Sequence, residues 1–341
     1  MKGVKSYFIN IALILLISGI SLYFSIGGEF QQVKEAISSA NLIWLIYLAL
    51  HMLSYYLVDA YSLLCFGKVY KKDYNFKQAL VNGLSGTLFN GLTPSSSGGQ
   101  FVQIFVFNNQ GIPPTIASSI LLLAFISYQT VLISFTLVVM LVHAGYYMHE
   151  GLAVTRMEAI GFLVNFIVTA ALFLGATSKR FQNFLINTVL LFLAKIHIIK
   201  NYEDSCAKIQ TYFEEFRKEL KLLQSDKRLF FKVCMCNLVK LLIMYSVPFF
   251  ACLALRIPVR ISQYFNFISL ASIINLINVF LPIPGASGGS EGSYMILFGF
   301  LGQTAASSSM FIWRVFSFYY GLILGLIVFM ASKDTKKKTK H

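Results

Sequence analysis

The chain has 341 residues, of which 57% are hydrophobic and only 12% are charged, and its mean hydropathy is +0.69. Soluble domains carry about 25% charged residues, so this composition excludes an ordinary soluble protein and predicts a membrane protein with several spans. The net charge of +14 does not indicate nucleic-acid binding, because basic residues gather in 178–232 and 332–341, beside apolar segments. Cations in such loops mark the cytoplasmic side and attract anionic lipid headgroups.

Six apolar runs approach or exceed the length of about 20 residues that a helix needs to cross the hydrocarbon core. The first run is free of charged residues over 6–28, which is too long for the core of a signal peptide, so we expect a retained helix. Residues 181–194 are too few to span the membrane and are predicted to form an interfacial or partly buried helix. The predicted spans are 6–27, 42–66, 115–142, 157–177, 233–255 and 310–331.

Two similar helix-breaking strings lie inside apolar sequence. Residues 94–100 read Pro-Ser-Ser-Ser-Gly-Gly-Gln and residues 284–290 read Pro-Gly-Ala-Ser-Gly-Gly-Ser, so Pro, Ser, Gly and Gly recur at an offset of 190. Asn90 precedes Pro94 by four residues, as Asn278 precedes Pro282. In lipid, an irregular backbone is tolerated only where protein or water surrounds it. Broken segments in corresponding halves of a chain therefore predict a binding site.

The surroundings of the strings predict two hairpins. Residues 78–149 contain no Asp, Glu, Lys or Arg and are too many for two spans alone. We therefore expect 78–110 to form a helical hairpin that enters the membrane from the cytoplasm and turns back. The positive-inside rule then places both chain termini and 178–232 in the cytoplasm, and the second hairpin, 262–309, enters from outside.

The predicted fold class is an all-α integral membrane protein with about six transmembrane helices and two re-entrant broken-helix hairpins in an inverted repeat. In the alternative interpretation Gly and Ser only allow helices to pack closely, which is the favoured role for Ser118, Ser119, Ser307 and Ser308. The whole chain, 1–341, is one polytopic domain. Its parts are a first repeat (42–142), a basic cytoplasmic segment (178–232), a second repeat (233–331) and a polybasic tail (332–341).

Four ionisable residues fall inside apolar segments, where a charge needs a partner, a cavity or the interface. Glu291 either caps the start of a half-helix, or contacts a cationic group or carries a proton. Arg314 pairs with Glu291 across the cavity, or clasps a phosphate, or extends to the outer interface. Asp59 and Lys240 form either a buried pair or two poles of the site, although Lys240 could also reach the cytoplasm.

We expect the two strings to bind a substrate, because backbone N–H groups at Gly98 and Gly99, where a half-helix begins, suit an anion such as a lipid phosphate. No Walker loop, metal-ligand cluster or G-x-S-x-G motif occurs, so no catalytic residue, metal or cofactor is predicted. The candidate substrate-binding residues are Asn90, Pro94, Ser97, Gly98, Gly99, Gln100, Pro284, Gly285, Ser287, Gly288, Gly289, Glu291 and Arg314.

The motifs Leu92-Thr93-Pro94 through Gln100, Leu281-Pro282-Ile283-Pro284-Gly285 through Glu291-Gly292, and Arg314 resemble the lysylphosphatidylglycerol synthase transmembrane family. This flippase-like family includes the membrane domain of the bacterial multiple peptide resistance factor. The resemblance extends from about the second predicted helix to the sixth. The family often has a glutamate where Gln100 stands and a basic residue where Ser290 stands.

The resemblance implies a flippase-like translocator of (lysyl-)phosphatidylglycerol or a related lipid in the bacterial inner membrane, contributing to cationic peptide resistance. Its implied partners are the bilayer, an anionic or aminoacylated phospholipid and a separate lipid-modifying enzyme. The alternative is a phosphatidylglycerol lysyltransferase, or its membrane subunit, that uses lysyl-tRNA. Few residues follow Ser332, so we do not expect synthesis from this polypeptide alone. A third interpretation is a scaffold on which an enzyme docks at 178–232.

Overall fold

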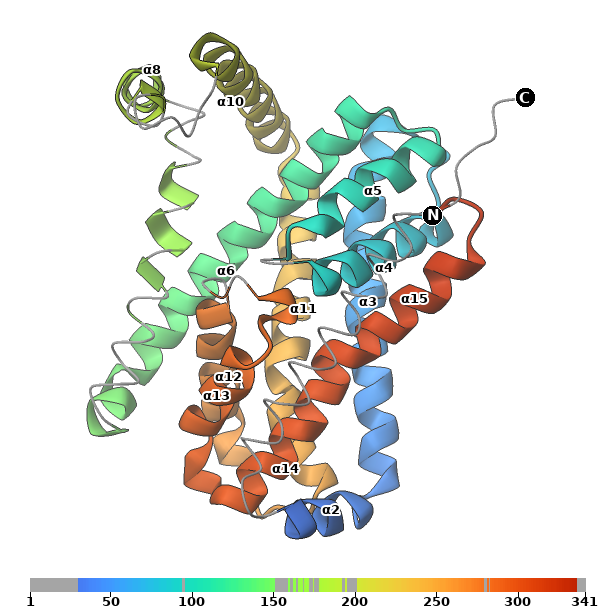
Figure 1. The fold of residues 1–341 in the computed structure, drawn as a ribbon, viewed down its shortest axis with the longest axis vertical. Coiled ribbons are helices and arrows are strands. Elements are labelled where there is room, and N and C mark those ends of the chain that lie inside the picture. Colours follow the sequence, from blue (N-terminus) through green and yellow to red (C-terminus); the bar gives the residue numbers. More distant parts are fainter. Residues whose placement is uncertain are drawn as a thin grey trace.

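The computed structural model describes residues 30–93, 96–150, 178–191, 201–278, 281 and 283–335, with residue 194 and scattered residues between 159 and 174. The predicted first span, 6–27, lies outside the described residues, as does much of the predicted fourth, 157–177. Every regular element in the described part is a helix (Figure 1), which confirms the all-α fold class.

Four of the described helices are long and apolar enough to cross a membrane. Among the described helices, α3 (Leu42–Tyr70) and α11 (Lys227–Ala254) form the most extensive pair, and they run in opposite directions. The third packs against both, and the fourth crosses in front of them in Figure 1. These helices are α3 (Leu42–Tyr70), α6 (Pro114–Glu150), α11 (Lys227–Ala254) and a continuous helix composed of α14 (Gln303–Arg314), η6 (Val315–Tyr319) and α15 (Tyr320–Ala331).

The last long helix begins at Gln303, earlier than the predicted start at 310. Gly302 separates this helix from the preceding turn. Its φ of 86° is a value that only glycine adopts readily. The first turns are rich in serine and therefore look polar in the sequence. However, the Ser308 hydroxyl donates to the Thr304 carbonyl at 2.7 Å, and the Ser309 hydroxyl donates to the Ala306 carbonyl at 3.1 Å. The hydroxyl groups of these serines therefore form their hydrogen bonds within the helix.

Each repeated string joins two antiparallel helices. In the first pair, α4 (Phe76–Leu92) and α5 (Gly98–Asn109) are held together at their far ends, where Gln110 Nε2 donates to the Gln78 carbonyl at 2.9 Å. In the second pair, α12 (Tyr264–Asn278) and α13 (Gly289–Leu297) meet at their far ends through the rings of Phe267 and Phe298, whose centroids are 5.2 Å apart. We call these the first and second helical hairpins.

The two strings share a left-handed residue at equivalent positions. Ser96 and Ala286 both have a φ of 51°, and they are separated by the same offset of 190 as the strings. The Ser96 N–H donates to the Thr93 carbonyl at 3.3 Å, and the Ala286 N–H donates to the Ile283 carbonyl at 2.9 Å. Positive φ is uncommon outside glycine, so the strings agree at this position. The following residues differ, because Ser97 has a ψ of −19° whereas Ser287 has a ψ of 141°.

The remaining elements connect or flank the long helices. A charged helix, α10 (Tyr202–Ser225), carries Lys208 and Asp204, which form an exposed ion pair of 2.7 Å. The main core gathers between α3, α11, α12 and α14, around the fully buried side chains of Met52, Val247 and Met310. The other helices are α2 (Phe30–Ser38), α8 (Lys179–Phe184), η2 (Leu185–Leu190), α10 (Tyr202–Ser225), η3 (Ile261–Gln263), η4 (Pro284–Ala286) and η5 (Gly299–Leu301).

Candidate functional site: a polar cavity between the two hairpins

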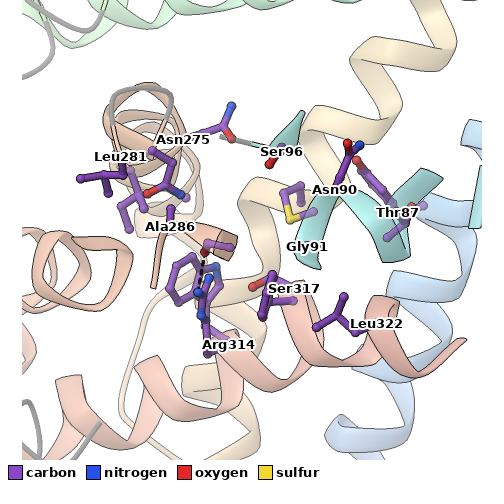
Figure 2. A pocket seen from close by; sticks show the side chains of 18 of the residues that line it. Thr87, Asn90, Gly91, Ser96, Asn275, Leu281, Ala286, Arg314, Ser317 and Leu322 are labelled. Carbon is purple, nitrogen blue, oxygen red and sulfur yellow. Dashed lines mark hydrogen bonds between the residues drawn. The ribbon is translucent and has the colours of Figure 1, made fainter. Parts of the chain in front are cut away.

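A cavity of about 450 Å³ lies between the two hairpins and the last long helix. We call it the first cavity. Figure 2 shows α4 on one side of it, α12 and η4 on another, and the helix that carries Arg314 and Ser317 closing the third. Tyrosines of α3 and α11 complete the wall. The polar lining residues are Tyr55, Tyr56, Thr87, Asn90, Ser96, Tyr245, Asn275, Asn278, Arg314 and Ser317.

Arg314 is the one formally charged side chain among the described residues that line this cavity. Its Nε lies 3.0 Å from Glu291 Oε1, and their side chains are 5% and 0% exposed. The contact is an ion pair rather than a well-aligned hydrogen bond. A single buried charge in a membrane protein is costly, and the neighbouring carboxylate offsets it. The ion pair is one of the arrangements that the sequence allowed for Arg314.

Other contacts fix the orientation of the guanidinium. Nη2 donates to the Gly285 carbonyl at 2.6 Å and approaches Ser287 Oγ at 3.1 Å. The ring of Phe318 stacks against Cζ at 4.3 Å, which is a cation–π arrangement. Among the described residues, no group accepts a hydrogen bond from Nη1. Arg314 therefore has one donor group left for a molecule in the cavity.

The backbone of η4 allows this close contact at Gly285. Its φ is 62°, and a Cβ at this position would lie 2.3 Å from Cζ of Phe318. A side chain therefore fits neither the conformation nor the space. The Arg314 side chain can reach the Gly285 carbonyl because the turn lies this close to η6, whose π-helical segment begins directly after Arg314. Such π-helical segments occur frequently at functional sites.

Glu291 also caps α13. Its Oε2 accepts the Gly288 N–H at 2.8 Å, while Oε1 faces Arg314. Gly288 has a φ of 88° and immediately precedes the helix. Glu291 therefore both caps the helix and contacts a cation. One carboxylate oxygen accepts from the N-terminus of α13, and the other faces Arg314.

The expected anion site at Gly98 and Gly99 is not open in the structure. The Gly98 N–H donates to Thr93 Oγ1 at 2.8 Å, and the Gly99 N–H donates to Asn90 Oδ1 at 2.9 Å. A Cβ on Gly99 would lie 2.6 Å from the Gly86 carbonyl oxygen. These two glycines therefore allow α4 and α5 to pack closely, which is the role predicted in the alternative interpretation.

The predicted site residues separate into four groups. Asn90, Gly285 and Arg314 line the first cavity, whereas Gln100 lines a second cavity beside it. Glu291, Ser287 and Gly288 support Arg314 through the contacts described above. Gly98, Gly99 and Gly289 pack against side chains, and a Cβ on Gly289 would lie 2.2 Å from Leu281. Ser97 precedes α5, Pro284 is buried in η4, and Pro94 lies outside the described residues.

The second cavity has a volume of about 250 Å³ and contains the other ion pair that the sequence allowed. Lys240 Nζ on α11 contacts Asp59 Oδ1 on α3. The side chains are 10% and 25% exposed, so Lys240 does not extend away to an interface. The structure therefore shows the Asp59–Lys240 pair, which is one of the arrangements that the sequence left open.

Several lining residues were not singled out from the sequence. Asn275 lies one helical turn before Asn278, and its Nδ2 donates to the Tyr245 hydroxyl at 3.0 Å. Ser317 lies three residues after Arg314 and faces the same cavity. The helical period of 3.6 residues would have identified both, because residues three or four apart share a face. Tyr55 and Tyr245 have no comparable signal, since apolar helices contain many aromatic residues.

The fold and the site define an all-α membrane protein with a polar, charge-bearing cavity enclosed by broken helices. The sequence profile described as the lysylphosphatidylglycerol synthase TM region matches residues 9–325. The chain belongs to this family, as its motifs indicated. No curated protein matches the chain.

Proposed function

We propose that this protein is a flippase-like translocator of a phospholipid, with (lysyl-)phosphatidylglycerol or a related anionic or aminoacylated lipid as substrate. Membership of a lipid-related membrane family supports the lipid class. The observation that carries the proposal is Arg314, which presents an unused donor to a polar cavity from within the apolar segment. A guanidinium N–H forms a strong, charge-assisted hydrogen bond with a phosphate oxygen, so a lipid phosphate suits this position.

In this proposal the headgroup occupies the first cavity while the acyl chains remain in the bilayer. A charged headgroup then does not pass through hydrocarbon, which is the main barrier to lipid translocation. The Glu291 carboxylate balances the charge of Arg314 when the cavity is empty. It also offers a negative charge to a cationic group on the lipid headgroup. The hairpins are re-entrant in this account, and the two repeats, 42–142 and 233–331, insert in opposite orientations.

The positive-inside rule supports a bacterial inner-membrane topology with both termini in the cytoplasm. The side of the first cavity formed by α12 and η4, which Arg314 contacts at Gly285, then belongs to the hairpin that enters from outside. A contribution to cationic peptide resistance would follow from moving aminoacylated lipid to the outer leaflet, where its positive charge repels cationic peptides.

The test is lipid translocation in proteoliposomes. Phosphatidylglycerol with a fluorescent acyl chain is reconstituted with the full chain, and a membrane-impermeant reductant quenches the label in the outer leaflet. We expect the wild type to accelerate loss of the inner-leaflet label and Arg314→Ala to remove most of this acceleration. Arg260→Ala is the matched control, because Arg260 is exposed and lies outside both cavities. Equal rates for the wild type and Arg314→Ala would refute the assignment.

A parallel assay separates transport from synthesis. The purified chain is incubated with labelled lysyl-tRNA and phosphatidylglycerol, and the lipid fraction is analysed for label. The translocator proposal expects no labelled lipid from this polypeptide alone. Labelled lysylphosphatidylglycerol would favour the transferase.

A further inference from the structure

Two asparagines occupy equivalent places in the two hairpins. Asn90 lies four residues before Pro94, and Asn278 lies four residues before Pro282. Asn90 is close to the end of α4, and Asn278 is the last residue of α12. Both side chains line the first cavity, so each hairpin brings one amide group to it.

In both hairpins the second helix holds the oxygen of this amide. Asn90 Oδ1 accepts the Gly99 N–H at 2.9 Å, and Asn278 Oδ1 accepts the Ser290 hydroxyl at 2.8 Å. Gly99 is the second residue of α5, and Ser290 is the second residue of α13. A donor on the oxygen fixes which end of an amide faces away from it, so both amides have the same orientation relative to their hairpins.

The nitrogen atoms of the two amides remain available. No described residue accepts a hydrogen bond from Nδ2 of Asn90 or of Asn278, and neither nitrogen is a fully buried atom. Asn275, one turn earlier on α12, shows the opposite arrangement, because its Nδ2 donates to the Tyr245 hydroxyl at 3.0 Å. The first cavity therefore receives one unused amide donor from each hairpin.

Asn278 and Arg314 are both fixed to the turn η4. The Ser290 hydroxyl that contacts Asn278 also lies 3.0 Å from the Ala286 carbonyl oxygen. Arg314 Nη2 donates to the carbonyl of the preceding residue, Gly285. The turn thus places a cation and an amide donor at one wall of the cavity, and α4 lies on the other side (Figure 2).

We infer that Asn90 and Asn278 bind the phosphate of the lipid headgroup from opposite hairpins, and that Ser290 is a positioning residue for Asn278. Phosphate oxygens accept hydrogen bonds, which suits two amide nitrogens and the guanidinium of Arg314. The bound phosphate then connects the two hairpins. This inference rests on the proposed function and deepens it, since it names the two amide donors and the supporting hydroxyl that recognise the headgroup.

The fluorescence of Trp313 tests this assignment. The chain has two tryptophans, and Trp313 lines the first cavity, so Trp44→Phe leaves it as the reporter. The full-length protein in detergent is titrated with dihexanoyl phosphatidylglycerol, with dihexanoylglycerol, which lacks the phosphate, and with inorganic phosphate. Thermal unfolding first establishes that each variant is folded.

Asn90→Asp and Asn278→Asp each keep the oxygen that accepts from the neighbouring helix and remove the amide nitrogen. We expect each to raise the dissociation constant for phosphatidylglycerol about tenfold or more, and to leave that for dihexanoylglycerol unchanged. Asn275→Asp is the matched control, because it adds the same charge to the same cavity but removes a nitrogen that Tyr245 already uses. It should weaken phosphatidylglycerol binding clearly less than Asn278→Asp does.

Ser290 is tested through Asn278. Ser290→Ala removes the hydroxyl that fixes the amide, so we expect severalfold weaker binding of phosphatidylglycerol. In the Asn278→Asp background the same substitution should have no further effect on this affinity, because Ser290 acts through Asn278. Equal losses in both backgrounds would show that Ser290 does not position Asn278.

Three results would overturn the inference while the proposed function stands. The first is an affinity for phosphatidylglycerol that Arg314→Ala lowers and both asparagine variants leave unchanged. The second is a loss in only one of Asn90→Asp and Asn278→Asp, since the phosphate would then contact one hairpin. The third is an equal loss in Asn275→Asp and Asn278→Asp, which assigns the effect to the added charge. No response of Trp313 to phosphatidylglycerol, or an equal affinity for inorganic phosphate, would instead count against the proposed function itself.

Discussion

Arg314 and Glu291 face each other at 3.0 Å between the last long helix and the second hairpin, and neither side chain is more than 5% exposed. The pair connects two elements that must stay in register if the cavity is to keep its shape. Breaking a buried ion pair by removing one partner typically costs about 3–5 kcal/mol, because the other charge remains buried and unpaired.

We therefore predict that Glu291→Gln destabilises the protein by about 3–5 kcal/mol and lowers its thermal unfolding temperature in detergent. The amide also loses the charge that caps α13. Glu214→Gln on the exposed face of α10 is the matched control and should leave the transition unchanged. An unchanged transition for Glu291→Gln would contradict the buried pair.

Gly285→Ala should also destabilise the protein, by about 1–3 kcal/mol, because φ is positive and the new Cβ meets the ring of Phe318. The double variant Gly285→Ala with Phe318→Ala separates the two causes. If the steric contact dominates, the cost of Gly285→Ala becomes smaller in the Phe318→Ala background, and thermal unfolding of all four proteins measures this coupling. Identical costs in both backgrounds would assign the whole effect to the backbone conformation.

The Asp59–Lys240 pair gives a prediction that depends on charge. Asp59→Asn should lower the unfolding temperature, because Lys240 then remains buried without a carboxylate. The exchange of the two charges in Asp59→Lys with Lys240→Asp should recover part of the loss. Recovery supports a direct pair between α3 and α11, whereas additive losses would speak against it.

Asn90 holds the first hairpin together and also lines both cavities. Asn90→Ala leaves the Gly99 N–H without its acceptor, so we expect a cost of about 1–3 kcal/mol. Asn108→Ala on α5 is a suitable control, since Asn108 is exposed. Chemical denaturation of both variants measures the difference, and equal stability would show that this hydrogen bond contributes little.

Much of the architecture could be predicted from the sequence because the two strings repeat with the same spacing. The left-handed conformation shared by Ser96 and Ala286 follows from that repeat. The burial of Arg314 beside Glu291 follows from the cost of isolated charges in apolar segments. The two hairpins and the Arg314–Glu291 pair could therefore be predicted from local sequence.

The roles of individual glycines could not be predicted in the same way. Gly98 and Gly99 precede a helix, and their N–H groups look available in the sequence. Their acceptors are side chains of Thr93 and Asn90, which reach them only after the hairpin closes. The start of the last long helix could not be predicted for a related reason. Its serines form hydrogen bonds within the helix, which the sequence does not show, so this part looks too polar for a span.

The central claim is that the first cavity holds a phospholipid headgroup next to Arg314. The most direct measurement places a photo-crosslinking amino acid at Ser317, which faces the cavity (Figure 2), and identifies the adducts by mass spectrometry after illumination in bilayers. The account predicts phospholipid adducts that fall at least severalfold in the Arg314→Ala background, while a crosslinker at the exposed Ile323 gives equal adducts in both. Adducts at Ser317 that are absent, or unaffected by Arg314→Ala, would contradict it.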